Sequence, residues 1–393
     1  MGWLNNSKQL LLTLGCVSVI FSGFNRYFTS HTPYFADVIQ LPGDLPSAVK
    51  HRHQCRGASE RIALFTYVTM KIAKRFYERP LATVDCYASR MNYTHIVVED
   101  TDPTLRAVCK QSRIYFRKHC AVRATLLARP DLRYLFVLDA DTGVCNPDHC
   151  LEHWIDDPTV DLEFHERFFL WEPSAANYVV KNTNYSLEFL SKWAAYHEKL
   201  PSSGYTSYDN GALLTLLLLE VFPDRPQYAI GCNKLWHTPG QYYAYVFCAD
   251  KHLRARARSK HIRLIKRAHA WVIDRHIVAD HWAAQTFMNH GWKTEQTNFD
   301  QHWPLSRIPT GDECDPIVRR AWPLKAHLRL DEAGMRQLLA AQERDRQRLL
   351  GFTPEPDIGQ CWPRCESNDS AQWTKSTFDF VRGNPLLLLR VPR

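Results

Sequence analysis

Two aspartates one residue apart, Asp139 and Asp141, directly follow the apolar run Tyr134–Leu138. A short continuous apolar run is typical of a strand buried on both faces of a parallel sheet. Open α/β sheets bind ligands just beyond the carboxyl ends of their strands. Because alternate residues of an extended chain point the same way, both carboxylates can face one hard cation, Mn²⁺ or Mg²⁺. The segment therefore predicts a divalent metal site that would hold a diphosphate.

A second pair with the same spacing, Asp100 and Asp102, follows the strand-like run His95–Glu99. One or two such pairs arise by chance in a chain of roughly this length, and the alternative for either pair is that it caps a turn. We favour the later pair because Asn146 is suited to an N-cap and Pro147 to a first helical position. Apolar residues then recur at helical spacing, which predicts a strand, an acidic turn and a helix.

The chain has 393 residues, of which 45% are hydrophobic and 12% aromatic, so a substantial core is available. Predicted strands alternate with predicted helices along its first half. The strands are expected at 61–68, 95–99 and 134–138, and the helices at 70–79, 86–92 and 105–128. This alternation predicts an α/β fold with a mostly parallel sheet flanked by helices.

The second half shows shorter strand-like segments over 160–183 and an apolar run over 212–222. We expect that run to be a core helix, and Asp209-Asn210-Gly211 before it to form a turn. Residues 251–269 hold eight Lys or Arg and three His. Such a stretch is either a nucleic-acid patch or a solvated helix face. We favour the helix face and expect no nucleic-acid partner.

The N-terminal segment Leu10–Phe24 is nearly all apolar but only 15 residues long, whereas a membrane span needs roughly 20. We favour a short signal-anchor, with a cleaved signal peptide or a buried helix as alternatives. Either of the first two would place the rest of the chain in the secretory lumen. The expected organisation is a cytosolic tail at 1–8, the anchor at 9–25, a stem at 26–58, a catalytic domain at 59–310 and a C-terminal extension at 311–393.

Cysteine usage agrees with an oxidising compartment. One of the 12 cysteines lies in the apolar segment and 11 lie beyond it, so at least one thiol is expected to be free or intermolecular. Cys361 and Cys365 have the spacing of a zinc half-site or a redox pair. No second half-site matches them, so we expect a disulfide staple. Sequons at Asn92, Asn184 and Asn368 fit the lumenal topology.

A later segment supplies partners for the two carboxylates: His290-Gly291-Trp292-Lys293. A His beside a glycine can approach a metal closely, and a Lys three residues later can reach a phosphate as a point charge. The alternative is that His290 is an ordinary partly buried histidine. His281, in Asp280-His281-Trp282, is the competing ligand.

Five segments occur in the order in which a known family has them: Tyr87–Tyr93, Leu138–Asp141, Lys181–Thr183, Asp209–Ala212 and His290–Lys293. With them the chain resembles a glycosyltransferase of the GT-A (Rossmann-like) type. It is similar to glycosyltransferase family 34, Golgi enzymes that transfer galactose, mannose or xylose with retention. It resembles more closely a related animal group of unassigned function.

The resemblance implies a nucleotide-diphosphate sugar as donor, a glycan or glycoprotein as acceptor, and Mn²⁺ or Mg²⁺ as cofactor. It also implies a type II Golgi membrane protein with a lumenal catalytic domain, the alternative being a secreted protein. The residues carried over are the metal ligands Asp139, Asp141 and His290, the donor contacts Lys293, Lys118 and Thr66, and the catalytic positions Asp209 and Asn210.

Two other functions stay open at this point. A metal-dependent phosphoesterase also uses Asp pairs and His, but two-metal sites need more ligands than one Asp pair and one late His. A non-catalytic lumenal binding protein with the same fold is the second alternative, because a fold does not guarantee activity.

Overall fold

The computed structural model describes residues 61–69, 76–168, 170–254, 259–293, 303–350, 358 and 362–363. The predicted tail, signal-anchor and stem lie outside these residues, as do Cys361, Cys365 and Asn368. None of the helices in the described part of the chain has the length and apolar character needed to cross a membrane.

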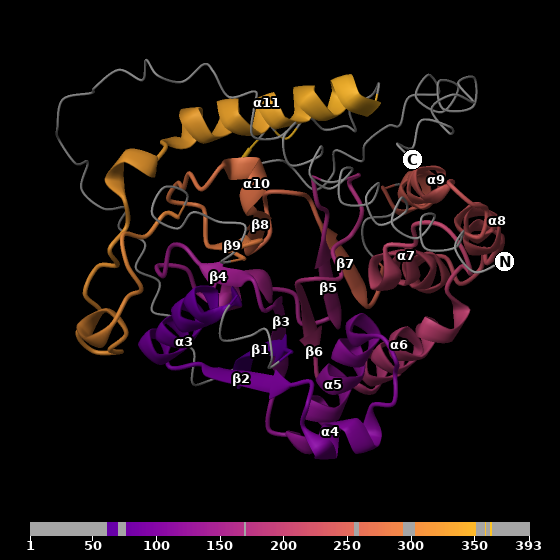
Figure 1. Cartoon of the computed structure of the whole chain (residues 1–393), viewed down its shortest axis with the longest axis horizontal. Coiled ribbons are helices and arrows are strands. Elements are labelled where there is room, and N and C mark those ends of the chain that lie inside the picture. The colour runs from indigo at the N-terminus through magenta and orange to yellow at the C-terminus, as the bar shows by residue number, and fades with distance from the viewer. Residues whose placement is uncertain are drawn as a thin grey trace, which may run out of the picture. The chain divides into compact units, whose positions relative to one another are not determined.

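The main sheet has six strands in the order β2-β1-β3-β6-β5-β7 (Figure 1). Their bounds are Ile62–Val68 (β1), Thr94–Glu99 (β2), Tyr134–Asp139 (β3), Leu162–His165 (β5), Tyr178–Lys181 (β6) and Ile262–Ile265 (β7). Strands β2, β1 and β3 run parallel, β6 is antiparallel to both of its neighbours, and β5 runs parallel to β7. The three predicted early strands and the mostly parallel α/β fold are therefore confirmed.

A second, three-stranded sheet has the order β4-β9-β8. Its strands are Thr142–Val144 (β4), Val272–Asp274 (β8) and Met288–His290 (β9). Strand β4 follows Asp141 directly, and its first residue, Thr142, pairs with His290. This small sheet therefore brings the late histidine segment to the carboxyl end of β3.

Helices cover the main sheet on both faces (Figure 1). The helices of the described residues are α3 (Glu78–Met91), α4 (Pro103–Val108), α5 (Ile114–Ala128), α6 (Asn184–Ala195), α7 (Tyr208–Val221), α8 (Gln227–Trp236), α9 (Tyr242–Arg254), α10 (Arg275–Val278) and α11 (Glu332–Leu350). Of these, α10 packs on β8 of the small sheet and α11 packs on α10. Four short 3₁₀ turns are η1 (Leu151–Trp154), η2 (Tyr196–Lys199), η3 (Gly311–Glu313) and η4 (Ala326–Leu328). Alternate residues of β1 point to opposite faces of the main sheet. Phe65 belongs to the hydrophobic cluster formed with α5 to α9, and Leu64 to the cluster formed with α3 and the small sheet.

Two early helix predictions need correction. Residues 70–75 of the helix expected at 70–79 lie outside the described residues. The expected helix end before Pro80 is wrong, because α3 is one helix that begins at Glu78 and includes Pro80 in its first turn. A proline there costs nothing, since first-turn N–H groups have no partner within the helix. The single helix expected at 105–128 is two helices, α4 and α5, joined by the Cys109–Cys120 disulfide.

The helix expected after Asn146 is absent from this described segment, which holds β4 and then only the 3₁₀ turn η1. The backbone N–H groups of Cys145 and Asn146 both donate to the Phe287 carbonyl. The Asn146 amide donates to the Ala284 carbonyl at 3.1 Å. The Asn146 side-chain oxygen does accept the Asp148 N–H at 3.2 Å, as an N-cap does. The chain around it is tied to residues 284–287, however, and forms only η1.

Two later predictions are also wrong in part. Asp209, Asn210 and Gly211 do not form a turn but lie in the first turn of α7, which continues through the predicted core run. The basic stretch 251–269 is not one helix face. Its first residues end α9, and Ile262 then begins β7, which pairs in parallel with β5.

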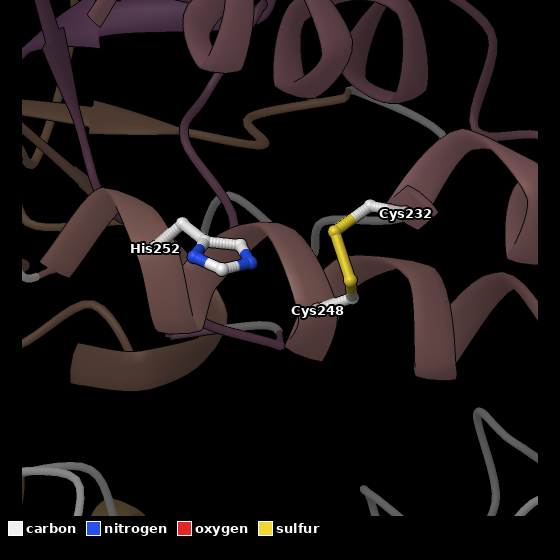
Figure 2. A group of neighbouring side chains, drawn as sticks. All are labelled: Cys232, Cys248 and His252. Carbon is white, nitrogen blue, oxygen red and sulfur yellow. A yellow bond between two sulfur atoms is a disulfide. The ribbon is translucent and has the colours of Figure 1, made fainter. Parts of the chain in front are cut away.

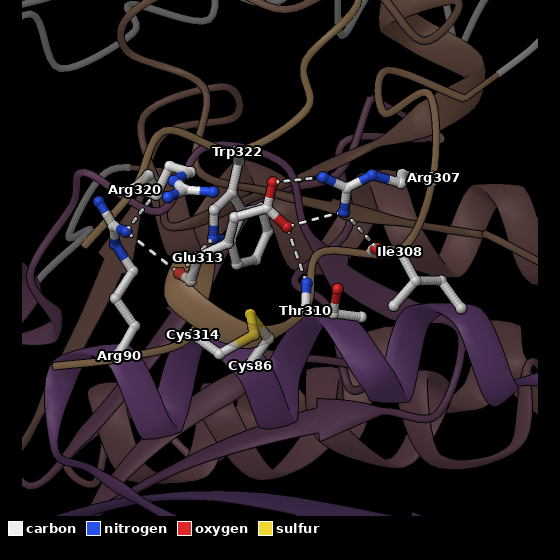
Figure 3. The surroundings of a disulfide bond; sticks show 9 residues. All are labelled: Cys86, Arg90, Arg307, Ile308, Thr310, Glu313, Cys314, Arg320 and Trp322. Atoms are coloured by element: carbon white, nitrogen blue, oxygen red, sulfur yellow. Dashed lines mark hydrogen bonds and ion pairs between the residues drawn. A yellow bond between two sulfur atoms is a disulfide. The ribbon is translucent and has the colours of Figure 1, made fainter. Parts of the chain in front are cut away.

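A disulfide between Cys86 of α3 and Cys314 joins the predicted C-terminal extension to the main sheet's helical cover (Figure 3). Beside it Arg90 donates to the backbone carbonyls of Glu313 and Arg320, at 3.1 and 2.8 Å. The Glu313 carboxylate accepts from the Arg307 guanidinium at 2.7 and 2.8 Å. Covalent and charged contacts therefore hold η3 on α3.

Candidate functional site

Three side chains converge at the carboxyl end of β3. One donor atom each from Asp139, Asp141 and His290 lies within 4.8 Å of the other two. The His290 Nε2 atom is 3.4 Å from an Asp141 oxygen and 3.9 Å from an Asp139 oxygen. The structure thus brings together the three residues predicted as metal ligands, from positions far apart in the sequence.

The backbone around the two aspartates is held from both sides. The Asp139 N–H donates to the Asn177 side-chain oxygen at 3.2 Å. The Asp141 carbonyl accepts the N–H groups of Gly291 and Trp292, at 3.1 and 2.9 Å. Gly291 has a φ of +102°, a conformation that glycine adopts readily, and it turns the chain after His290 so that both donors reach Asp141.

His290 is oriented by Asp274, the last residue of β8. Its Nδ1 atom lies 2.7 Å from an Asp274 oxygen, which leaves Nε2 facing the two aspartates. A histidine that binds a metal commonly donates its other ring N–H to a carboxylate in this way. Our sequence reasoning missed Asp274, although Trp271-Val272-Ile273-Asp274 repeats the pattern of an apolar run that ends in an aspartate.

The charges of the cluster depend on one another. Burial acts to lower the pKa of His290, but Asp141 and Asp274 outweigh it and raise that pKa to about 10. Burial acts to raise the pKa of Asp141, but His290 and Lys293 lower it to about 2. Without a cation, His290 is therefore protonated and serves as the counterion of Asp141. A divalent cation could take over that role if His290 released its proton.

Two lysines lie on either side of the aspartate pair. The Lys118 ammonium donates to Asp139 at 2.8 Å and to the Ala175 carbonyl at 2.9 Å. The Lys293 ammonium is 3.5 Å from an Asp141 oxygen. The Lys118 side chain is only 7% exposed, whereas that of Lys293 is 43% exposed. Lys293 is therefore the cation that an incoming anion can reach.

Asp209 lies on the inner side of Lys118, with an oxygen 3.8 Å from the ammonium. The same oxygen is 3.2 Å from His119, whose ring stacks on Trp193 with centroids 3.4 Å apart. Burial acts to raise the pKa of Asp209, but His119 and Lys118 lower it overall. Burial lowers the pKa of His119 to about 4. A neutral His119 therefore holds an ionised Asp209 at neutral pH.

Asn210 and Thr66 make different contacts from those predicted for them. The Asn210 side-chain oxygen accepts the Ala175 N–H at 2.7 Å, and the Ala175 carbonyl in turn accepts from Lys118. Asn210 therefore positions the loop that anchors Lys118. The Thr66 hydroxyl is buried in β1 and shares a hydrogen bond of 3.0 Å with His95. Its role as a donor contact stays a prediction.

Two competing metal sites find no support in their geometry. The His281 Nδ1 atom lies 3.1 Å from the Val278 carbonyl, and the neighbouring Asp280 pairs with Arg275. A second group of possible ligands comprises Cys232, Cys248 and His252 (Figure 2). Its two sulfur atoms are bonded to each other in a disulfide, so neither is a thiolate that could bind a metal.

Comparison with known proteins places the chain in a family. Residues 84–306, more than half of the chain, match the family model described as "Protein of unknown function, DUF273". The chain belongs to this family. The match includes every residue of the site described above except Thr66. The family description names no activity, so the resemblance to glycosyltransferase family 34 stays a prediction.

No curated protein matches the chain. One similar solved structure is a glycosyltransferase involved in the glycosylation of the major capsid of PBCV-1. It shares 13% identity with a TM-score of 0.37, over 58% of this chain and 92% of that chain. Another is a protein from STIV, with 12% identity and a TM-score of 0.23, over 34% of this chain and 68% of that chain.

Proposed function

We propose that this protein transfers a hexose or pentose from a nucleotide-diphosphate sugar to a glycan acceptor, with retention and with Mn²⁺ or Mg²⁺ as cofactor. One observation carries the proposal. Two carboxylates and an imidazole converge at the carboxyl end of β3, between an exposed lysine and a buried lysine that faces a third carboxylate. Ligands of α/β sheets bind at such strand ends.

Asp139, Asp141 and His290 suit a divalent cation, since carboxylate oxygens with one imidazole are ligands that Mn²⁺ accepts. Asp274 already fixes the His290 ring, as the partners of metal-binding histidines do. When bound, the cation would stabilise the negative charge that develops on the leaving diphosphate. Lys293, whose ammonium lies 3.5 Å from an Asp141 oxygen, would contact a phosphate oxygen of the donor, and the buried Lys118 holds Asp139 in place.

Asp209 supplies a fixed negative charge on the other side of Lys118. Its carboxylate is ionised and is held by His119, so it can stabilise positive charge on the reacting sugar, as a carboxylate does in glycosidases. We assign it no covalent bond to the sugar. The acceptor hydroxyl attacks from the face that the diphosphate leaves, and its proton passes to the leaving diphosphate.

We further propose that the protein works in the secretory lumen, anchored in the Golgi membrane as a type II protein. Disulfides such as Cys86–Cys314 suit an oxidising compartment. The sequons at Asn92 and Asn184 lie at exposed asparagines. In sealed microsomes the protein should resist added protease and be shortened by an endoglycosidase after lysis. Digestion of the site-bearing domain from the cytosolic side would contradict this placement.

The reaction is tested by incubating the protein with UDP- and GDP-sugars in Mn²⁺ and measuring release of the nucleoside diphosphate and transfer to added glycans. We expect turnover of at least one donor, and its loss in chelator. Full activity in chelator would remove the cation from the proposal. Hydrolysis of phosphate monoesters without turnover of any sugar nucleotide would favour the phosphoesterase alternative. Donor binding without any turnover would favour the non-catalytic alternative.

A further inference from the structure

Three tyrosines are exposed near Asp209 in the described part of the chain. They are Tyr115, Tyr205 and Tyr208, which are 46%, 58% and 37% exposed. All three belong to two segments beside Asp209. Tyr205 and Tyr208 precede it in the chain, and Tyr115 lies on α5 near its partners Lys118 and His119. Exposed aromatic rings gathered beside a candidate site point to a binding surface.

Tyr115 and Tyr208 form a stacked pair, with ring centroids 4.9 Å apart and planes 15° apart. The guanidinium carbon of Arg113 lies 5.1 Å from the centroid of the Tyr208 ring. On α5, Tyr115 precedes Lys118 by three residues and His119 by four, so all three share one face of the helix. The pair is therefore joined to the Asp209 side of the site.

The backbone holds Tyr208 outward at a conformational cost. Ser207 and Tyr208 have φ angles of 51° and 45°, in the left-handed region that residues with side chains rarely adopt. The flanking carbonyls are clamped by buried indoles. Trp236 donates to Thr206 at 3.1 Å, and Trp193 donates to Asp209 at 3.0 Å. Two consecutive strained residues that the surrounding core enforces are typical of functional sites.

Electrostatics also places Tyr115 beside the site. Burial of the ring is the main cause that raises the pKa of the Tyr115 phenol, and Asp209 is the largest of the charges that act on it. Lys293 and Asp139 act on the same group. The phenol is therefore within electrostatic reach of Asp139, Lys293 and Asp209.

We propose that the Tyr115–Tyr208 pair binds a sugar ring of the acceptor glycan, an inference that rests on the proposed function. A pyranose ring has an apolar face of C–H bonds, and this face packs on the negative π face of an aromatic ring. The donor's diphosphate belongs with Asp139, Asp141 and Lys293. The tyrosine pair instead adjoins Asp209, the carboxylate assigned to the reacting sugar, which is where an acceptor must approach.

The test uses the full chain on an array of defined N-linked, O-linked and glycosaminoglycan oligosaccharides, with Mn²⁺ and UDP present. Tyr115→Ala should weaken glycan binding about 5- to 100-fold, the range for loss of one stacked ring in nucleotide recognition. Tyr115→Phe should retain it. Tyr208→Ala is the second variant, and Ile230→Ala, at a 57% exposed position of α8, is the control. UDP affinity should change less than about twofold in all of them.

Three results would overturn the inference: wild-type glycan binding by both alanine variants, no glycan bound by the wild type, or loss of UDP affinity in Tyr115→Ala. The last result would assign the ring to the nucleotide base instead. Donor hydrolysis measured on the same samples separates this outcome from failure of the proposed function. If the wild type turns over a donor while the tyrosine variants bind glycans normally, only the acceptor surface is refuted.

Discussion

The chain contains two aspartate pairs of identical spacing at the ends of two parallel strands, and they have different partners. Asp100 and Asp102 follow β2. Asp139 is the last residue of β3, and Asp141 follows that strand. Both strands pair with β1. The local pattern that favoured the later pair, a helix after Asn146, is not formed, so the comparison isolates what the tertiary structure adds.

At the end of β2 the carboxylates serve the fold. Asp102 caps α4 by accepting the N–H groups of Thr104 and Leu105, at 2.7 and 3.1 Å. Asp100 accepts a hydrogen bond from the Tyr67 hydroxyl and pairs with the Arg117 guanidinium. An arginine keeps its proton at any ordinary pH, so a cation would have to compete with a permanent charge. The capping alternative therefore describes Asp102, whereas Asp100 is the partner of Tyr67 and Arg117.

At the end of β3 the carboxylates lie beside His290, whose side chain can lose its proton and its charge. Strand β2 lies at an edge of the main sheet, whereas β3 lies between β1 and β6 and continues into β4 of the small sheet. That sheet delivers His290 and, behind it, Asp274. A neutral imidazole is a metal ligand, and a guanidinium is not. The contrast shows that the neighbouring sheet, and not the spacing, makes the second pair a candidate metal site.

The largest expected difference between the two pairs is in cation binding. Asp139→Asn and Asp141→Asn should each lower Mn²⁺ affinity at least about 100-fold and abolish sugar transfer, because each removes a charged ligand. Asp102→Asn should leave Mn²⁺ affinity unchanged, since Asn also serves as an N-cap. Mn²⁺ titration of the purified proteins measures both. Equal losses of Mn²⁺ affinity in Asp102→Asn and Asp141→Asn would show that the two aspartate pairs do not differ in metal binding.

The second prediction concerns protons. His290 has a pKa of about 10 without a cation, so binding at neutral pH must release one proton. Mn²⁺ affinity should therefore rise about tenfold for each pH unit between roughly pH 6 and 8. Asp141, with a pKa of about 2, is already ionised there and adds no slope. Calorimetry in buffers of different ionisation enthalpy counts the protons, and His290→Gln should release none. Binding independent of pH in the wild type, together with unchanged Mn²⁺ affinity in His290→Gln, would exclude His290 as a ligand.

The third prediction compares two Asp–His pairs. Asp274→Asn should weaken Mn²⁺ binding by roughly 10-fold, because the His290 ring loses the carboxylate that orients it. Asp161 makes the same kind of contact with His261, at 2.5 Å, so Asp161→Asn is the matched control. It should alter thermal stability but not Mn²⁺ affinity. A similar loss of affinity in both variants would mean that destabilisation, and not ring orientation, explains the effect.

The smallest expected effect is a change in stability at Asp102, in the pair that follows β2. Asp102→Ala should lower the free energy of unfolding by about 1 kcal/mol through loss of the α4 cap, and Asp102→Asn should change it little. Urea denaturation followed by circular dichroism measures both. Loss of sugar transfer in a folded Asp102→Ala protein would give this pair a functional role that its contacts do not explain.

Local pattern predicts strands better than helix ends in this chain. Strands β1 to β3 are readable because each contains a short apolar run, which is buried in β1 and β3 and only partly buried in the edge strand β2. The helix expected after Asn146 does not form, because the backbone of Cys145 and Asn146 is bonded to Phe287. The catalytic position assigned to Asn210, whose side-chain oxygen accepts the Ala175 N–H, stays a prediction. The failed helix prediction reflects a contact between residues far apart in the sequence.

The sequence by itself determined the α/β class, the strand that carries Asp139 and Asp141, and the candidacy of His290 and Lys293, since these follow from hydrophobic runs and residue chemistry within short segments. Only the tertiary structure decided which aspartate pair meets the histidine, that Asp274 orients it, and that His119 and Trp193 hold Asp209. The physical reason is that these contacts depend on the strand order and on the small sheet. Both bring together segments that are far apart in the sequence, and the local pattern of one segment does not specify which other segment it contacts.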